Sequence, residues 1–417
     1  MIETILLILD IVTLVFGVLA IGLCVLFGIK RGTFNSGMRI AILLISAVIA
    51  FFVANWIDHI LSDVAMGMIT STVAHEIINM PSALTLIEYI VRGVMMPLLY
   101  LPIFFIIDKI LLIPYFIVKS KLKNNERLHG FKFDKLFGGI IGGVVGAIIA
   151  LIGIMPFSGY EFYLAHTHDL FRDTSLEQVI PEEFGELVDG LADAPALKAN
   201  GFLTNWFFHS LTDKLDVATE SISVLVHTYE AVLAPEVDDP AVTPEQKEEK
   251  AKQKIDSLKE SLHGLTHESA ELTAGIIKDA VGTMIQDAHE EAPIDLVGKV
   301  LADVVIGLDE VKEAITEEEF DNEVESISHL VELATKQENV NAVESVKTVL
   351  ESQVVSDAVA GNKEEIIEKY DNEFSNASEE TKTEIKNMIE EKKNSAEYEK
   401  YADTIEIIEK LFGIKVQ

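Results

Sequence analysis

Residues 136–155 read LFGGIIGGVVGAIIALIGIM, an uncharged stretch of 20 residues. As a helix this stretch would be about 30 Å long, which is the thickness of the hydrocarbon core of a bilayer. In lipid, a strip of glycines lets a second helix approach closely, whereas in water each glycine would cost a helix about 1 kcal/mol relative to alanine. The stretch therefore predicts a membrane-spanning helix with a packing face made of Gly138, Gly139, Gly142, Gly143 and Gly146. This face either packs the helices of a bundle or lets a helix slide or hinge.

Three other apolar runs come before this one, at residues 5–29, 38–57 and 89–118. No Lys or Arg precedes the first run, which is therefore expected to be a retained span and not a cleaved signal peptide. Three prolines interrupt the third run, which predicts either one crossing helix or a shorter span that ends at Asp108. Between the second and third runs, residues 63–79 are expected to form a helix on the membrane surface. Residues 1–158 are thus predicted to form a four-helix membrane domain.

The charge of the chain is distributed unevenly. Residues 1–158 contain 11 Lys and Arg and 9 Asp and Glu, whereas residues 159–417 contain 22 and 58. The net charge of the second part, −36, argues against nucleic acid as a partner because phosphates would be repelled. The single cysteine, Cys24, allows no intramolecular disulfide.

Nine of the 11 basic residues of the first part gather in two loops. They are Lys30, Arg31 and Arg39 in one loop, and Lys119, Lys121, Lys123, Arg127, Lys132 and Lys135 in the other. The positive-inside rule places such loops in the cytoplasm. We therefore expect a multi-pass protein of the plasma or inner membrane with both termini outside the cytoplasm.

After residue 158 the pattern predicts amphipathic helices and no strands, so the whole chain is assigned to the all-α class. We expect a juxtamembrane helical segment at 159–233, a Pro-rich linker at 234–243 and an acidic, soluble helical domain at 244–417. Helices are predicted at 161–172, 178–191, 216–233, 296–308, 379–393 and 398–412, and a long helix from Pro244 through Ile276. Residues 200–209 are rich in aromatic residues and are expected to form either a small core or a patch that lies on the membrane. Capping boxes are expected at Thr316–Glu319 and Asn394–Glu397.

The membrane part resembles a known family. An early acidic residue in the first span is followed by Gly28-Ile-Lys-Arg-Gly32, and Asp134-Lys-Leu-Phe-Gly138 opens the last span. This arrangement is similar to the colicin V production protein (CvpA) family over about residues 5–158. Two positions depart from the family pattern, because Thr33 replaces the usual aromatic residue and Lys135 replaces a frequent arginine. The motif residues are Lys30, Arg31, Gly32, Asp134, Lys135 and Gly138. The resemblance implies an inner-membrane protein linked to toxin production or export and to envelope homeostasis, without a known reaction.

Three ionisable residues lie inside the predicted spans, namely Asp10, Asp108 and Lys109. Each costs about 2.5 kcal/mol or more at the centre of a membrane helix, so such groups usually face a partner or a wet cavity. Because Asp108 and Lys109 are sequence neighbours, they point in different directions and each is expected to need its own partner. They indicate either structural contacts between helices or a path for ions or protons.

The acidic part offers two candidate metal sites. Glu260, His263, His267 and Glu271 would share one face of a continuous helix, and Glu260-x-x-His263 has the spacing found in carboxylate-bridged di-iron bundles. Those bundles need a second such pair, which the sequence lacks, so we expect no metal and no cofactor here. The other candidate is His166-Thr-His168-Asp169. No nucleophile elbow, phosphate loop or zinc-protease motif is present, so we expect no enzyme.

Two classes of function follow. The first is a non-enzymatic scaffold or export accessory that lies in the lipid bilayer and binds a protein partner through an extracytoplasmic helical domain. The second is a transporter or channel that uses Asp10, Asp108 and Lys109. The glycine strip also allows a homo-oligomer.

Overall fold

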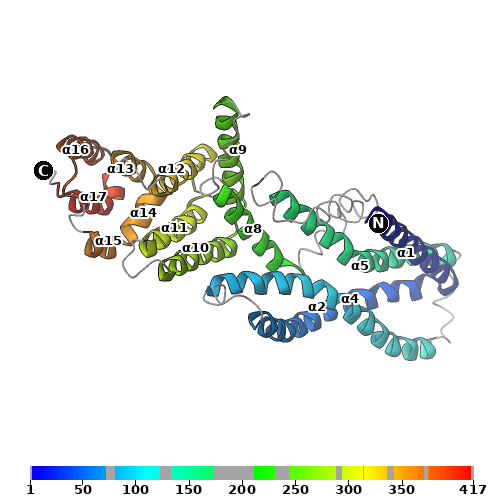
Figure 1. The fold of residues 1–417 in the computed structure, drawn as a ribbon. Helices are drawn as coiled ribbons and strands as arrows, with labels where there is room; N and C mark the ends of the chain where they lie inside the picture. The colour runs from blue at the N-terminus through cyan, green and yellow to red at the C-terminus, as the bar shows by residue number, and fades with distance from the viewer. Residues whose placement is uncertain are drawn as a thin grey trace. The chain divides into compact units, whose positions relative to one another are not determined.

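The computed structural model describes residues 2–71, 80–122, 133–171, 174, 211–230, 244–287, 294–312, 314–335, 342–370 and 374–414. Within these ranges every regular element is a helix, and no strand is present (Figure 1). The chain divides into two compact units, one formed by residues 1–72 and 88–216 and the other by residues 73–87 and 217–417. The predicted all-α class is confirmed for the described part of the chain.

Four long helices dominate the first unit. They are α1 (Ile2–Arg31), α2 (Thr33–Thr70), α4 (Pro81–Leu122), whose first turns belong to the second unit, and α5 (Asp134–Phe171). Each contains a segment long and apolar enough to cross a membrane: Ile11–Arg31, Thr33–Thr70, Pro81–Ile117 and Asp134–Ile154. The four predicted apolar helices are therefore confirmed.

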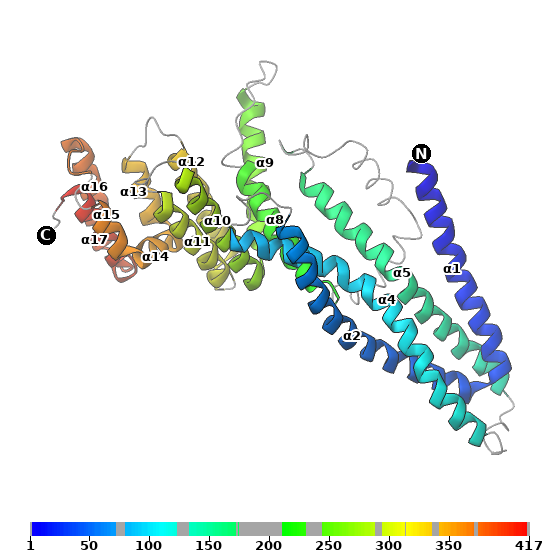
Figure 2. The same cartoon turned by 60° about the horizontal axis from the view of Figure 1, so that its bottom comes forward.

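The surfaces of these helices are apolar. Large side chains that are more than half exposed occur on all four: Val18, Leu26, Phe52, Trp56, Ile106, Ile113, Leu136 and Ile140. Apolar surface on this scale is unusual for a protein in water, and it matches a surface that faces lipid. Figure 2 shows α1 and α5 side by side along much of their length.

Three predicted boundaries in this unit were wrong. The second helix begins at Thr33, so Arg39 lies inside the helix and not in a loop. Residues 63–70 continue α2 and form no separate surface helix. The last helix continues beyond Pro156 to Phe171, so no new helix starts at residue 161. Proline removes one backbone donor but does not have to end a long helix when neighbouring groups satisfy the freed carbonyl.

The second unit contains short amphipathic helices. They are α8 (Asp213–Thr228), which begins in the first unit, α9 (Pro244–His263), α10 (His267–Asp287), α11 (Ile294–Val311), α12 (Glu317–Thr335), α13 (Ala342–Glu351), α14 (Gln353–Gly361), α15 (Lys363–Tyr370), α16 (Glu379–Lys393) and α17 (Tyr398–Phe412). The predicted helices at 379–393 and 398–412 have the bounds that the sequence pattern indicated. The predicted helix at 178–191, the aromatic cluster at 200–209 and the linker at 234–243 lie outside the described residues.

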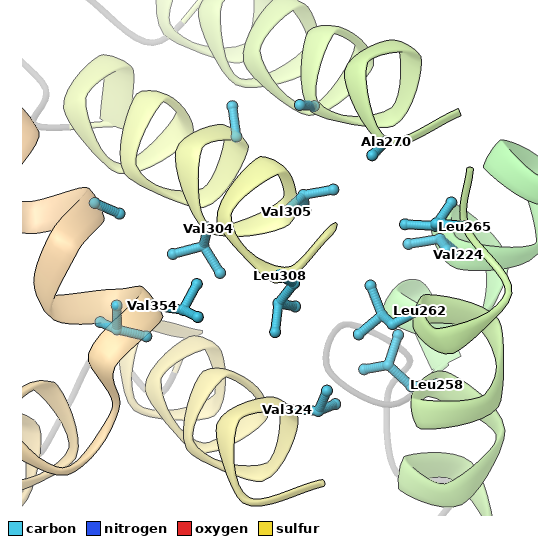
Figure 3. Close-up of a cluster of buried hydrophobic side chains, with 14 of the residues drawn as sticks. Val224, Leu258, Leu262, Leu265, Ala270, Val304, Val305, Leu308, Val324 and Val354 are labelled. Carbon is cyan, nitrogen blue, oxygen red and sulfur yellow. The ribbon is translucent and has the colours of Figure 1, made fainter. Parts of the chain in front are cut away.

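Two large groups of buried apolar side chains hold the described part of this unit together, and a smaller one around Ile366 and Ile407 joins α15 to α17. The first joins helices from α8 to α14, and Figure 3 shows Leu308 of α11 between Val354 of α14 and Leu258 and Leu262 of α9. The second joins α13, α16 and α17 around Val346, Leu350, Ile385, Ile389, Tyr401, Ile405 and Phe412. Burying an aliphatic or aromatic side chain of this size contributes about 1.5–3 kcal/mol. These helices therefore bury their apolar faces against one another.

Local hydrogen bonds decide where several of these helices begin. The capping box at Thr316 is confirmed, because the Thr316 backbone N–H donates to the Glu319 carboxylate over 2.8 Å and Glu319 N–H donates to the Thr316 hydroxyl. The box at Asn394 was wrong. Asn394 ends α16, and its side-chain amide donates to the Glu390 carbonyl instead of opening the next helix.

Candidate functional site

A stripe of small and polar residues lines one face of α2. Its buried members are Asn35, Ser36, Arg39, Ile42, Leu43, Ser46, Ala50, Ala54, Asp58 and Ser62. From Ser46 onward a buried residue recurs at every fourth position, so these small side chains form a narrow row along one side of the helix. On α4, the buried residues Met96, Tyr100, Phe104 and Asp108 recur at the same spacing, and three of these four are large. The two stripes meet in one apolar cluster, so large side chains of α4 pack against small ones of α2.

An ion pair between these two stripes neutralises Asp108. The Arg39 guanidinium contacts Asp108 with two nitrogens, with Nη1 donating to Oδ1 and Nη2 donating to Oδ2 over 2.7 Å. Both side chains are nearly inaccessible. A bidentate arginine–carboxylate contact of this kind is among the strong hydrogen-bonded arrangements of a buried carboxylate.

Lys109 behaves differently from its neighbour. Its side chain is 71 % exposed, and its ammonium lies 3.7 Å from the Asp108 carboxylate. The prediction of a separate partner for each residue therefore holds for Asp108, which pairs with Arg39, and was wrong for Lys109, which lies near the same carboxylate. Long lysine side chains can cover apolar surface while the charged end reaches a polar layer.

Further polar contacts lie on either side of this ion pair, along the line where α2 and α4 meet, which we call the seam. Tyr115 donates its hydroxyl to the Asn35 side-chain oxygen over 3.1 Å, and the Asn35 amide donates to the Arg31 carbonyl over 2.7 Å. At the other end, Arg92 Nε donates to Asp58 Oδ2 over 3.4 Å. Of the residues that form the ion pair and these hydrogen bonds, the sequence analysis had singled out only Asp108 as a polar group inside a span.

The glycine strip of α5 lies directly against α1. A Cβ on Gly138 would lie 2.5 Å from the Gly28 carbonyl oxygen, one on Gly142 would lie 3.0 Å from the Gly28 Cα, and one on Gly146 would lie 2.6 Å from the Ile21 Cα. These distances are below or at the limit for a real Cβ, and the obstacles are backbone atoms that cannot rotate away. The backbones therefore touch along this row, as small-residue packing in membranes requires.

The two other glycines of the strip contact side chains instead. A Cβ on Gly139 would lie 2.8 Å from Ile29 Cγ1, and one on Gly143 would lie 3.4 Å from Val25 Cγ2. A side chain can rotate or shift slightly, so these positions tolerate a methyl group more readily than the backbone row does.

The ends of α1 and α5 meet at the residues that carry the family resemblance. Gly32 has a φ of 78°, which favours glycine, and a Cβ there would strike the Asp134 carboxylate. Asp134 Oδ1 accepts a hydrogen bond from Thr33 N–H over 2.8 Å, and the Thr33 hydroxyl donates to the Asp134 carbonyl over 3.0 Å. Thr33, where the sequence departs from the family pattern, therefore links the two motifs.

Gly138 also lies against Gly32 in this junction, whereas the other three motif residues have exposed side chains. Lys30 and Lys135 are exposed. Arg31 is exposed as well, with its guanidinium 5.2 Å from the Phe27 ring centroid. Asp10 lies in α1, but its side chain and those of His166, His168 and Asp169 are outside the described part of the structure.

The four candidate metal ligands of the second unit do not lie on one helix face. Helix α9 ends at His263 and α10 begins at His267, so the predicted continuous helix through Ile276 was wrong. Glu220 accepts hydrogen bonds from the Thr266 and Ser269 hydroxyls, which fixes the new helix start. The break puts Glu260 and His263 on one helix and the other two candidates on the next.

Each candidate histidine has a different neighbour. The His263 ring packs 4.5 Å from the Phe320 ring. His267 Nδ1 lies 3.0 Å from Asp309 Oδ2, and the hydrogen bond to this carboxylate, with Glu271 adding to it, raises the pKa of His267. Among the side chains that the structure describes, no three potential ligands gather as a metal site would require.

A partly buried histidine gives the second unit a pH dependence that can be measured. His227 Nδ1 contacts Ser261 Oγ, and burial lowers the pKa of His227 although Glu260 and Glu230 oppose the shift. The folded protein therefore takes up this proton at lower pH than the unfolded chain does. Because the folded state disfavours protonated His227, the contribution of this residue to the free energy of unfolding is fully present above the unfolded pKa of about 6.5. It is lost as pH falls below that value.

We expect the free energy of unfolding of the full-length protein in detergent, measured by denaturant titration, to fall between pH 7.5 and pH 5.5. His227→Gln should lose less, because the glutamine does not titrate. The carboxylates are common to both proteins, so the difference isolates the histidine. A larger loss in the variant would contradict the prediction.

Together these observations define a class: an all-helical protein with four helices long and apolar enough to cross a membrane, which suggests that it is embedded in one. No family model matches the chain, and no curated protein and no solved structure matches it. The resemblance to the colicin V production family thus stays a prediction.

Proposed function

We propose that this protein is a non-enzymatic scaffold or accessory protein of the cell membrane, acting in export or envelope homeostasis as the resemblance to the colicin V production family implies. The observation that carries this proposal is the Arg39–Asp108 pair. Its carboxylate is held by two guanidinium nitrogens and is almost inaccessible. A transport site needs a carboxylate that can exchange its proton or ion, and a forked pair of this kind favours a fixed structural contact.

The acidic part of the chain supplies the interaction domain in this proposal. Residues 159–417 carry a net charge of −36, and the described helices after α8 bury their apolar faces in their own clusters. Charged residues then remain for the surface, which favours a protein partner with a basic face.

The orientation of the chain can be tested with fusions. The proposal places both termini outside the cytoplasm, because the basic loops lie inside. A C-terminal alkaline phosphatase fusion should be active, and a C-terminal green fluorescent protein fusion should be dark. A fluorescent fusion together with an inactive phosphatase fusion would refute this orientation and the extracytoplasmic position of the acidic part.

Flux measurements separate the scaffold from the transporter. Purified full-length protein in proteoliposomes should show no proton or ion flux above that of empty vesicles. A flux that Asp108→Asn abolishes and Asp63→Asn preserves would favour the transporter instead. Asp63 is a suitable control because it is exposed on α2 and loses the same charge.

A further inference from the structure

A cavity of about 120 Å³ lies in the first unit, between α2, α4 and the start of α8. One part of its wall is apolar and is formed by Phe51, Met96 and Leu211. The charged part consists of two carboxylates and two cations: Asp58, Asp213, Arg92 and Lys214. A water molecule needs roughly 10–15 Å³ on this scale, so the cavity has room for a small organic group.

One carboxylate oxygen in this wall is buried without a partner. The Asp58 side chain is 3 % exposed, and its Oδ2 accepts a long hydrogen bond of 3.4 Å from Arg92 Nε. Its Oδ1 has no hydrogen-bond partner among the described residues. Burying a charged oxygen in this way is costly unless a donor reaches it. A ligand that brings an N–H donor would remove this cost.

The charges of the cavity select the kind of ligand. Two carboxylates and two cations give the wall no net charge, so neither a bare cation nor a bare anion is favoured. A zwitterion fits both signs, with its ammonium at Asp58 and its anionic group toward Arg92 and Lys214. Arg92 also lies 3.7 Å from Glu88, so its guanidinium contacts one carboxylate of the lining, Asp58, and one outside it, Glu88.

The position of the cavity along α2 points to the membrane surface. Asp58 is 19 residues beyond Arg39, which is about 29 Å along a helix. The hydrocarbon core is about 30 Å thick, so the Arg39–Asp108 pair and Asp58 cannot both lie near its centre. When the first pair is inside the core, the cavity reaches the level of the lipid headgroups or beyond it.

We propose that this cavity binds a zwitterionic group that carries a primary ammonium next to an anion, with the ammonium donating to Asp58 Oδ1. Phosphoethanolamine has this chemistry, whether it comes as the headgroup of phosphatidylethanolamine or as the free soluble compound. Phosphocholine has the same charges but lacks N–H donors. It should therefore leave Asp58 Oδ1 unsatisfied.

Binding is measured on the full-length protein in detergent by native mass spectrometry. The lipid arm compares phosphatidylethanolamine with phosphatidylcholine, and the soluble arm compares O-phosphoethanolamine with phosphocholine. We expect the ethanolamine member to bind about tenfold or more tightly than the choline member, as one lost hydrogen bond to a charged group predicts. Preference in the lipid arm alone identifies a lipid headgroup, and preference in the soluble arm identifies a soluble ligand.

Three variants test the role of Asp58. Asp58→Asn should remove the preference for ethanolamine, and Asp63→Asn, which changes the same charge on an exposed site of α2, should keep it. Asn55→Trp leaves Asp58 intact but fills the cavity from an exposed lining position, so binding should weaken there too even if Asp58→Asn folds poorly. Equal binding of ethanolamine and choline compounds, or undiminished binding to Asn55→Trp, would overturn the proposal.

Discussion

Replacing Gly142 by leucine is expected to separate α1 from α5 and to cause one of the two largest losses of stability in the membrane unit. The new Cβ alone would lie 3.0 Å from the Gly28 Cα, and the rest of the side chain has no route past the α1 backbone. Overpacking a well-packed site typically costs about 1–3 kcal/mol, and obstacles made of backbone place this site at the upper end. Thermal melts of the full-length protein in detergent would measure the loss.

A graded set of variants distinguishes close packing from a general effect of glycine. Gly143→Ala meets a side-chain methyl group at 3.4 Å and should be tolerated, whereas Gly142→Ala should already destabilise. Gly22→Leu is the matched control on α1, because no atom lies within 4 Å of its added Cβ. Equal tolerance of Gly142→Leu and Gly22→Leu would remove the packing role of the strip.

The patterns that predicted structure well are those that one helix carries by itself. An uncharged run of about 20 residues predicts a span regardless of its neighbours, and the amphipathic spacing at 379–393 and 398–412 gave the observed bounds. The glycine row also needs no partner to be recognised. The identity of the facing helix, α1, depends on how the chain packs, and the spacing within α5 alone does not contain it.

The polar contacts between α2 and α4 were not predicted because Arg39 was assigned to a loop. Basic residues near a span end were assigned to the cytoplasmic side, so the partner of Asp108 was overlooked. The stripe itself was visible, because Ser46, Ala50, Ala54 and Asp58 recur every fourth residue. Arg39 lies seven residues before Ser46 on the same buried face, so the stripe indicated that Arg39 belongs to the helix, but the carboxylate that it meets depends on how α2 packs against α4.

In the second unit, the spacing of apolar residues concealed a helix end. Apolar residues on one helical face continue across residues 258–276, at Leu258, Leu262, Leu265, Leu272 and Ile276, so the pattern predicts one helix. The break after His263 depends on Glu220, a residue of another helix, which accepts hydrogen bonds from the hydroxyls at the start of α10. Contacts between distant parts of the chain can override a local period in this way.

The second large effect is expected at the Arg39–Asp108 pair. Arg39→Ala leaves a buried carboxylate without its counter-charge, and removing one partner of a buried pair typically costs about 3–5 kcal/mol. Lys109→Ala is the matched control, because it removes a positive charge from the residue next to Asp108. Its side chain is 71 % exposed, so the expected change is within about 0.5 kcal/mol.

A double variant identifies the source of this loss. Arg39→Met with Asp108→Leu removes both charges and keeps apolar volume in the seam, so it should recover much of the stability lost by Arg39→Ala. Recovery would show that the uncompensated carboxylate, and not the missing arginine, causes the destabilisation. If Arg39→Ala and Lys109→Ala had equal effects on melting temperature, the ion pair would not be a structural element of the unit, and the main support for the scaffold over the transporter would be lost.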